Sequence, residues 1–529
     1  MEHIEVFLIG LFVAVAGLST LARRLSIPYP IPLVLGGLVL GAVPGLPEIE
    51  LNPDLVLVIF LPPLLFYAAF NASLRDLRAD MRPISLLSIG LVLLTTCAVA
   101  VVAHTTISGM PWAMAFALGA IVAPTDPVAA TTIMRRLGVP RRLVTVIEGE
   151  SLVNDASALI AYRVAVAAAV GGSFSLGEAV VDFVVAAIGG VAVGLAAGWV
   201  IGQVRSRLDD PPVEITVSLL TGYAAYVPAE EIGLSGVLAA VTAGLYIGRI
   251  SPEISSGRMR IQGFATWDVL TFLLNATLFL LIGLQLNTIL DGLSGYSTGD
   301  LIGWGALIAG TVILTRIVWA FTTPYVIRAL DRRESQRERR TGAAFRMVSA
   351  WSGMRGAVSL AAALALPLET DAGAPLPQRD LILFLTFGVI LATLVLQGLS
   401  LPALIRALRI RDDGVERERE EVRARLVAAK AALAALDELV EADWTREDTI
   451  QRMRAMYDYR LRRFGARAGK LPDDGYEDRS LAYQRAVQAV IAAQHRAVVD
   501  LRNEGQIADD VMRQIERELD LEEERLEIT

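Results

Sequence analysis

The chain has 529 residues, of which 54% are hydrophobic and 20% are charged, and its formal net charge is −8. Its mean hydropathy of +0.51 is well above that of ordinary soluble globular proteins, which predicts a membrane protein. One cysteine and three scattered histidines exclude a disulfide scaffold and a cysteine-based zinc cluster and argue against a histidine-ligated metal, while the negative charge argues against nucleic acid as the main partner.

Apolar runs close to the length of about 20 residues that crosses a bilayer recur as far as residue 408. The second run is short and rich in glycine and proline, and only a few residues separate the eighth from the ninth, so twelve or fourteen spans are alternatives to thirteen. We predict thirteen spans near 4–22, 31–46, 53–71, 83–104, 111–134, 142–170, 176–203, 213–229, 232–249, 263–287, 301–328, 342–368 and 380–408.

The arginines outside these spans predict the orientation. With thirteen alternating spans, the loops on one side carry nearly all of them, whereas the opposite loops carry only Arg379. By the positive-inside rule, the arginine-rich side is cytoplasmic. We therefore predict a multi-pass protein of the cell membrane with its N-terminus outside and its C-terminus in the cytoplasm. The first span is not a cleavable signal peptide, because Glu2 and Glu5 precede it and its positive charges follow it.

The last part of the chain has a different composition. Residues 412–529 contain 28 acidic and 20 basic residues, so the whole net charge lies there, and their periodicity is helical. A break at 465–475 divides them into two helical parts. We predict a transmembrane domain over 1–410 and a cytoplasmic helical tail over 411–529 that regulates or dimerises the protein; a coiled coil with a separate partner is the alternative.

The fifth predicted span contains a Thr-Asp pair between two prolines. An ionised side chain at the centre of a span costs about 2.5–3.5 kcal/mol, so Asp126 needs a partner, water or a function. Pro124 and Pro127 each lack an amide donor, and Pro127 disfavours helical dihedral angles at Asp126. We predict a helix interrupted at mid-membrane, next to protein or a cavity. A simple proline kink with Asp126 as a helix cap is the alternative.

The sixth predicted span places oxygen atoms on one helix face. Ser151 and Asp155 are four residues apart and share a helix face. Glu148, seven residues before Asp155, lies on roughly the same face. A hydroxyl one turn from a carboxylate suits a hard cation such as Na⁺ or Li⁺ and does not suit softer metals. For Asn154 and Asp155 as a pair, a structural hydrogen bond or a helix cap is the alternative.

The twelfth predicted span contains Arg355 with a glycine on each side of it. Glycines permit an unwound segment, in which a guanidinium offsets a carboxylate or the negative end of a half-helix. We predict that Arg355 pairs with Glu150 or Asp126; direct participation in ion handling is the alternative. Two interrupted helices, one early and one late, are typical of an inverted-repeat transporter with its site at the midplane. Two further embedded arginines are candidate accessory residues: Arg163 and Arg316.

Four motifs together resemble the sodium/proton exchanger branch of the monovalent cation:proton antiporters. They occur in order within residues 1–410, at 61–66, 123–127, 149–155 and 353–358. The resemblance implies an all-α fold of about thirteen spans with inverted repeats and two crossing interrupted helices. It also implies a homodimer in the lipid bilayer, alternating access, no cofactor, and transport of Na⁺ and H⁺.

The resemblance also implies roles for individual residues. Asp155 occupies the position of the aspartate that binds a cation or a proton in turn. The residues implied to complete the Na⁺ shell are Thr125, Asp126 and Ser151. Asn154 is implied to hold the broken helix, and Glu150 to brace the core by pairing with Arg355. Many relatives carry an acid at the position of Tyr67, and this neutral phenol leaves the choice between Na⁺ and K⁺ open.

Competition at one carboxylate is the predicted mechanism. Desolvation disfavours ionised Asp155 and a bound cation favours it, so the site takes H⁺ or Na⁺ and disfavours crossing the membrane empty. One-for-one exchange is electroneutral, unless Asp126 titrates as well. The alternatives are a K⁺/H⁺ or mixed-cation antiporter, a membrane-embedded hydrolase that uses Asp126 and Asp155, and an ion sensor that signals through the tail.

Overall fold

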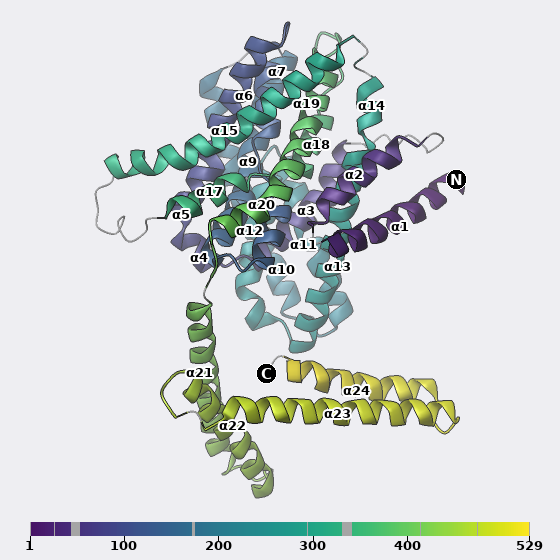
Figure 1. The fold of residues 1–529 in the computed structure, drawn as a ribbon, viewed down its shortest axis with the longest axis vertical. Helices are drawn as coiled ribbons and strands as arrows, with labels where there is room; N and C mark the ends of the chain where they lie inside the picture. The colour runs from purple at the N-terminus through teal and green to yellow at the C-terminus, as the bar shows by residue number, and fades with distance from the viewer. Residues whose placement is uncertain are drawn as a thin grey trace. The chain divides into compact units, whose positions relative to one another are not determined.

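The protein is all-helical throughout the part of the chain that the structure describes, as the sequence predicts. The computed structural model describes residues 2–25, 27–43, 53–171, 175–291, 293, 295–330, 341–412, 414–472 and 474–527. Its contacts separate two compact units, Met1–Arg411 and Asp412–Thr529. Helices make up both units (Figure 1), and the extended pairing found in the described ranges is a single bridge between Glu369 and Pro375.

Every predicted apolar range contains helix. In the first half of unit one the helices are α1 (Glu2–Leu25), α2 (Pro30–Gly41), α3 (Pro53–Asn71), α4 (Leu74–Ala79), α5 (Met81–Ser85), α6 (Val92–Thr106), α7 (Trp112–Val122), α8 (Val128–Arg136), α9 (Arg141–Gly171) and α10 (Leu176–Arg205). In the second half they are α11 (Pro211–Glu231), α12 (Gly236–Ile254), α13 (Gly257–Leu284), α14 (Leu286–Asp291), α15 (Thr298–Leu330), α17 (Ala343–Trp351), α18 (Ala357–Leu364), α19 (Arg379–Ala392) and α20 (Gly398–Ala407). Residues 44–46 of the second predicted span lie outside the described residues.

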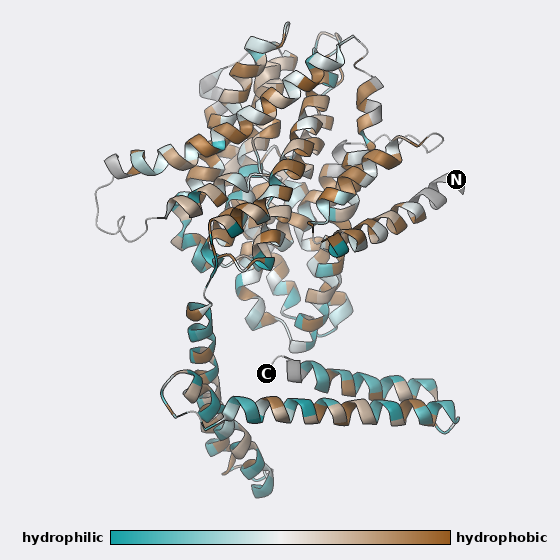
Figure 2. Cartoon of the chain, viewed as in Figure 1, coloured by the Kyte–Doolittle hydropathy of each residue, from teal (hydrophilic) through white to brown (hydrophobic). Residues whose placement is uncertain are grey.

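The outer surface of unit one is apolar, as a membrane protein requires. Seven of the described helices are long and apolar enough to cross a membrane by length and composition. Unit one is mostly brown in Figure 2, and on α10 the side chains of Ile188 and Trp199 are 67% and 57% exposed. Such side chains are unfavourable in water and favourable against lipid or another protein. The count of thirteen spans stays a prediction.

Two helices of unit one are interrupted, at the two places predicted from the sequence. Residues 123–127 separate α7 from α8, and residues 352–356 separate α17 from α18. The two interruptions contact each other, because the amide of Asp126 donates a hydrogen bond of 2.8 Å to the carbonyl of Met354. Each break thus satisfies a backbone group that lipid would leave without a partner.

Two π-helical turns interrupt the hydrogen-bond ladder of neighbouring helices. The first, η1 (Leu86–Leu91), joins α5 to α6, and the second, η2 (Thr393–Gln397), joins α19 to α20. The amide of Arg355 donates to the hydroxyl of Thr393 in η2 at 3.1 Å. Such turns are frequent at functional sites, and this one receives the backbone of the second interruption.

Unit two consists of two helical hairpins. They are α21 (Val415–Leu439) with α22 (Glu447–Arg467), and α23 (Tyr476–Asn503) with α24 (Asp509–Glu527). The contacts Arg454–Asp437 and Arg467–Glu418 show that the first hairpin is antiparallel. The contacts His495–Glu516 and Arg502–Asp509 show the same for the second. The predicted break at 465–475 falls at the connection between the hairpins. The helices of this unit are coloured mostly teal in Figure 2, so hydrophilic residues predominate in them.

Candidate ion-binding site

A cavity of about 310 Å³ lies beside the first interruption, enclosed by α3, α8, α9, α13 and α18. Its size is sufficient for a cation with several waters, because a water occupies about 30 Å³ in the liquid. Four of the five residues predicted at the ion site line this cavity, and Asn154 does not. The four come from the first interruption and from α9: Thr125, Asp126, Ser151 and Asp155.

The cavity-lining face of α9 carries three of the polar residues. Glu148, Ser151 and Asp155 all line the cavity, which is the arrangement that their spacing in a helix predicts. Ser151 and Asp155 are 8% and 6% exposed, so the carboxylate is buried at the wall of the cavity. A buried carboxylate without a counterion is costly, and a cation or a proton in the cavity removes that cost.

Asp126 contributes to the cavity and also caps a helix. One oxygen of its carboxylate accepts a hydrogen bond of 2.9 Å from the amide of Val128, in the first turn of α8. Gly356 lies directly against its other oxygen, because a Cβ atom at Gly356 would be 1.9 Å from Oδ2. Asp126 therefore caps α8 and lines the cavity at the same time, and the second interruption needs glycine at position 356 for space.

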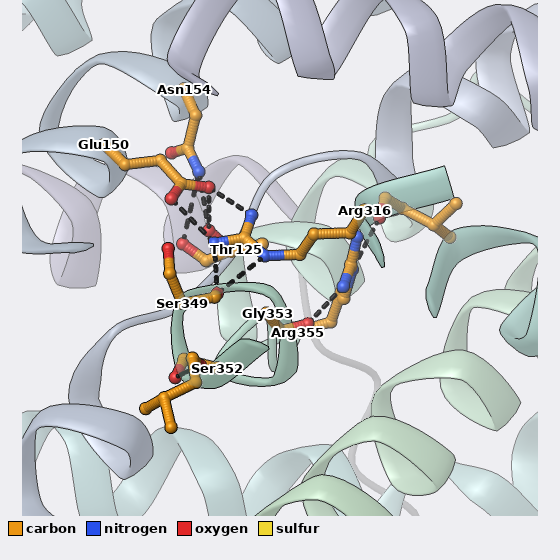
Figure 3. A network of polar contacts seen from close by, with 10 residues as sticks. Thr125, Glu150, Asn154, Arg316, Ser349, Ser352, Gly353 and Arg355 are labelled. Atoms are coloured by element: carbon orange, nitrogen blue, oxygen red, sulfur yellow. Dashed lines mark hydrogen bonds and ion pairs between the residues drawn. The ribbon is translucent and has the colours of Figure 1, made fainter. Parts of the chain in front are cut away.

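Glu150 pairs with Arg316, so the predicted pair of Glu150 with Arg355 is wrong. Figure 3 shows the two side chains in contact. Nη2 of Arg316 donates to Oε2 of Glu150 at 2.7 Å, Nη1 donates to Oε1, and both side chains are 2% exposed. Arg316 also donates to the carbonyl of Ser349 at 3.3 Å. The absence of a side chain at Gly353 allows this approach, since a Cβ atom there would lie 2.5 Å from Cδ of Arg316.

Arg355 instead caps a half-helix. Its Nε donates a hydrogen bond of 3.0 Å to the carbonyl of Val122, the last residue of α7, and Nη1 donates to the carbonyl of Gly353. The interruption leaves the carbonyls at the end of α7 without intrahelical partners, and a guanidinium there also offsets the negative end of the helix. Arg355 therefore lies at the negative end of a half-helix, the second of the two kinds of group that a guanidinium at this position was expected to offset.

Asn154 and Thr125 tie the first interruption to α9. Nδ2 of Asn154 donates to Oγ1 of Thr125 at 3.0 Å, and this hydroxyl donates to Oε1 of Glu150 at 3.1 Å (Figure 3). Asn154 is fully buried. The hydroxyl of Thr125 thus braces the interruption through two protein partners, and its second lone pair leaves it able to ligate a cation.

Of the predicted accessory residues, Tyr67 lines the cavity and Arg163 does not. The hydroxyl of Tyr67, which lines the cavity, donates to Asp268 of α13 at 2.7 Å. Arg163 pairs with Glu230 of α11 and is not among the residues around the cavity. Asp268 was not among the predicted site residues, although it lies inside the predicted span 263–287, where an acid is the signal of a functional residue.

A further ion pair borders the cavity. Arg135 of α8 and Glu148 of α9 both line it and are joined at 2.6 Å. Their side chains are 68% and 32% exposed, which places this pair at the rim and not in the buried part. Being exposed, the pair contributes little to stability and is easily opened.

Comparison with known proteins gives consistent matches. The family model described as "Sodium/hydrogen exchanger, transmembrane" matches residues 10–407. An uncharacterized Na⁺/H⁺ exchanger of Mycobacterium tuberculosis is 36% identical over 525 residues, which cover 98% of this chain and 96% of that protein. A sodium, potassium, lithium and rubidium/H⁺ antiporter of Bacillus subtilis is 34% identical over 417 residues, covering 76% of this chain and 61% of that protein.

The fold also matches a solved structure. The sodium proton antiporter MjNhaP1 from Methanocaldococcus jannaschii superimposes with a TM-score of 0.59 at 20% identity. The match covers 77% of this chain and 99% of that one. At this identity the likeness concerns the fold alone.

Proposed function

The chain belongs to the family of transmembrane sodium/hydrogen exchangers, and we propose that it exchanges Na⁺ or Li⁺ for H⁺ at Asp155. It is a multi-pass membrane transporter of monovalent cations and protons, not an enzyme, which removes the hydrolase alternative. One observation carries the proposal: buried Asp155 lines a cavity together with Ser151 and Asp126, beside two interrupted helices.

The charge of the Asp155 carboxylate explains why such a site would exchange ions. An ionised, unpaired Asp155 in this buried position is unfavourable, whereas Na⁺ or H⁺ at the carboxylate neutralises it. Na⁺ and H⁺ compete for the same carboxylate oxygens. The site therefore changes its accessibility from one side of the membrane to the other either with Na⁺ bound or with Asp155 protonated, and the carboxylate is neutralised in both forms. Asp126 already uses one oxygen to cap α8. We therefore assign the exchange to Asp155 alone, with one proton per cation and no net charge moved.

The position of the rim pair Arg135–Glu148 indicates the side of the membrane from which the cavity is reached. These residues lie beside the connection between α8 and α9, which the arginine distribution predicts to be cytoplasmic. We propose that this conformation is open to the cytoplasm. Alternating access then requires closure at the rim and opening at the opposite end of the same cavity.

A mixed-cation antiporter is the second candidate function. It is favoured by the Bacillus subtilis relative, which is named for sodium, potassium, lithium and rubidium. It is also favoured by Tyr67, a neutral side chain whose hydroxyl is bound to Asp268 at the cavity. Measuring proton movement after separate pulses of Na⁺, Li⁺, K⁺ and Rb⁺ distinguishes the two candidates.

The remaining features of the proposal concern the whole molecule. We propose a homodimer in the cell membrane, with the N-terminus outside and the tail of residues 411–529 in the cytoplasm. The resemblance in four motifs supports the dimer, and the one-sided distribution of arginines supports the orientation. The tail would then regulate or dimerise the transmembrane domain of residues 1–410.

Reconstitution tests the transport proposal. The purified protein is placed in sealed liposomes with a trapped pH dye, and cation pulses should move protons in the wild type. Asp155→Asn should abolish this movement while leaving a monodisperse, helical protein. Asp182→Asn, the same change at an exposed position of α10, is the matched control and should transport normally. Exchange retained by Asp155→Asn would place the site elsewhere, and cation binding without transport by the wild type would indicate a sensor.

A further inference from the structure

Unit two contains a cavity that the exchange mechanism does not use. It measures about 880 Å³ and lies where α21, α22, α23 and α24 meet. Four arginines line it, and among the described lining residues the carboxylates are limited to that of Glu522: the arginines are Arg425, Arg460, Arg463 and Arg479. Residues 412–529 have 28 acidic and 20 basic residues, so this positive lining is opposite in sign to its own domain.

Two of the four arginines are committed to carboxylates of the protein. Nε and Nη2 of Arg463 donate to both oxygens of Glu477, at 3.0 and 2.9 Å, in a bidentate pair. Nε of Arg425 donates to Glu421 at 2.8 Å. These pairs fix the wall of the cavity, and they leave its charge to the other two arginines.

Arg460 and Arg479 carry the positive charge of the cavity. Within the described ranges, neither has a carboxylate at ion-pairing distance. Arg460 lies over the ring of Tyr457, with 5.4 Å from its guanidinium carbon to the ring centroid. Arg479 lies over Tyr476 at 4.8 Å, and its donors reach only the backbone carbonyls of residues 474 and 475. Planar guanidinium groups that have no carboxylate partner and lie over an aromatic ring are suited to bind phosphate oxygens.

Four aromatic rings and three alanines of α21 are also part of the lining. Tyr457, Tyr459, Phe464 and Tyr483 line the cavity, and the ring of Tyr483 is 66% exposed. The hydroxyl of Tyr459 donates to the carbonyl of Tyr476 at 2.7 Å, which holds α22 against α23. The alanines of α21 leave room between these rings, where a flat ligand group can stack.

We propose that this cavity binds a nucleoside phosphate, with its phosphates at Arg460 and Arg479 and its base against Tyr483. Inorganic phosphate alone would leave most of the cavity's 880 Å³ and its aromatic wall unused. The volume lies within the range of about 300–1,000 Å³ that is typical of small-molecule sites. Ser480 and Gln484, which also line the cavity, supply hydrogen-bonding groups for the edge of a base.

Titration calorimetry on the full-length protein in detergent tests the proposal. ATP, AMP and inorganic triphosphate are the probes, and ATP should bind saturably. Arg460→Gln and Arg479→Gln should each weaken ATP binding by about tenfold or more, because each removes a charge-assisted hydrogen bond. Tyr483→Ala should weaken binding of ATP and leave binding of triphosphate unchanged. Arg485→Gln, on the same helix but outside the cavity lining, is the matched control and should bind like the wild type.

Other outcomes would overturn the proposal. Absence of saturable ATP binding to the wild type, with the helix content intact by circular dichroism, would do so. ATP affinity that is the same in the wild type and in both arginine variants would place any binding elsewhere. Equal binding of ATP and triphosphate, unaffected by Tyr483→Ala, would exclude recognition of a base. A change of oligomeric state in the arginine variants, with no nucleotide bound, would make the cavity an interface between copies. The assay measures binding, so it is independent of the transport proposal.

Discussion

Replacing Arg316 by methionine tests the buried ion pair that braces the candidate site. Arg316 and Glu150 are each 2% exposed, and the guanidinium donates two hydrogen bonds to the carboxylate. Methionine retains an unbranched side chain but leaves the carboxylate buried without its counterion. Because the removal of one partner from a buried pair costs about 3–5 kcal/mol, we expect Arg316→Met to lower the free energy of unfolding by that amount.

Denaturant unfolding of the purified protein, followed by tryptophan fluorescence, measures this loss. Adding Glu150→Gln to Arg316→Met removes the stranded charge, so the double variant should recover much of the stability. Arg355→Met should cost less, about 1–3 kcal/mol, because it removes the cap of α7 and leaves the ion pair intact. An Arg316→Met protein as stable as the wild type would refute the pairing, as would a double variant less stable than both single variants.

Three further predictions concern transport. Gly356→Ala should abolish exchange in a folded protein, because its Cβ atom would lie 1.9 Å from Oδ2 of Asp126 and must displace that carboxylate; an unchanged rate of dye-detected proton movement would contradict this. If Na⁺ and H⁺ compete at Asp155, acidification should raise the apparent KM for Na⁺, approaching tenfold per pH unit, at a constant maximal rate; a KM independent of pH would exclude a shared site. If exchange is one for one, clamping the membrane potential with K⁺ and valinomycin should leave the Na⁺-driven rate unchanged, and strong voltage dependence would refute electroneutrality.

The sequence predicts the features of this fold that depend on local chemistry. Pro124 and Pro127 remove amide donors from one span, and the helix ends at Val122 and resumes at Val128. The spacing of Ser151 and Asp155 follows the helical period, and both residues line one cavity. In each case the determining atoms lie within one or two turns of the chain, so no knowledge of the tertiary structure is needed.

Interactions between distant residues are beyond such local reasoning. Glu150 and Arg316 are 166 positions apart, and Tyr67 and Asp268 are 201 apart. Arg316 and Arg355 are both buried, and the sequence spacing does not show which of them pairs with Glu150. The tertiary structure determines the pair. Gly353 has no side chain to block Arg316 from reaching Glu150, whereas the side chain of Arg355 extends to the end of α7.

The backbone contact between the two interrupted helices has a consequence for the direction of exchange. Asp126 and Met354 are joined through their main chains, and Arg355 adds a second link to the end of α7. Sliding one half-helix past the other would break both links where Met354 and Arg355 are buried, so the freed groups would be costly. We therefore expect the two interruptions to move together as one rigid piece. Under the proposed alternating access, an ion would then meet the same oxygens from either compartment, and its intrinsic affinity would be similar on the two sides.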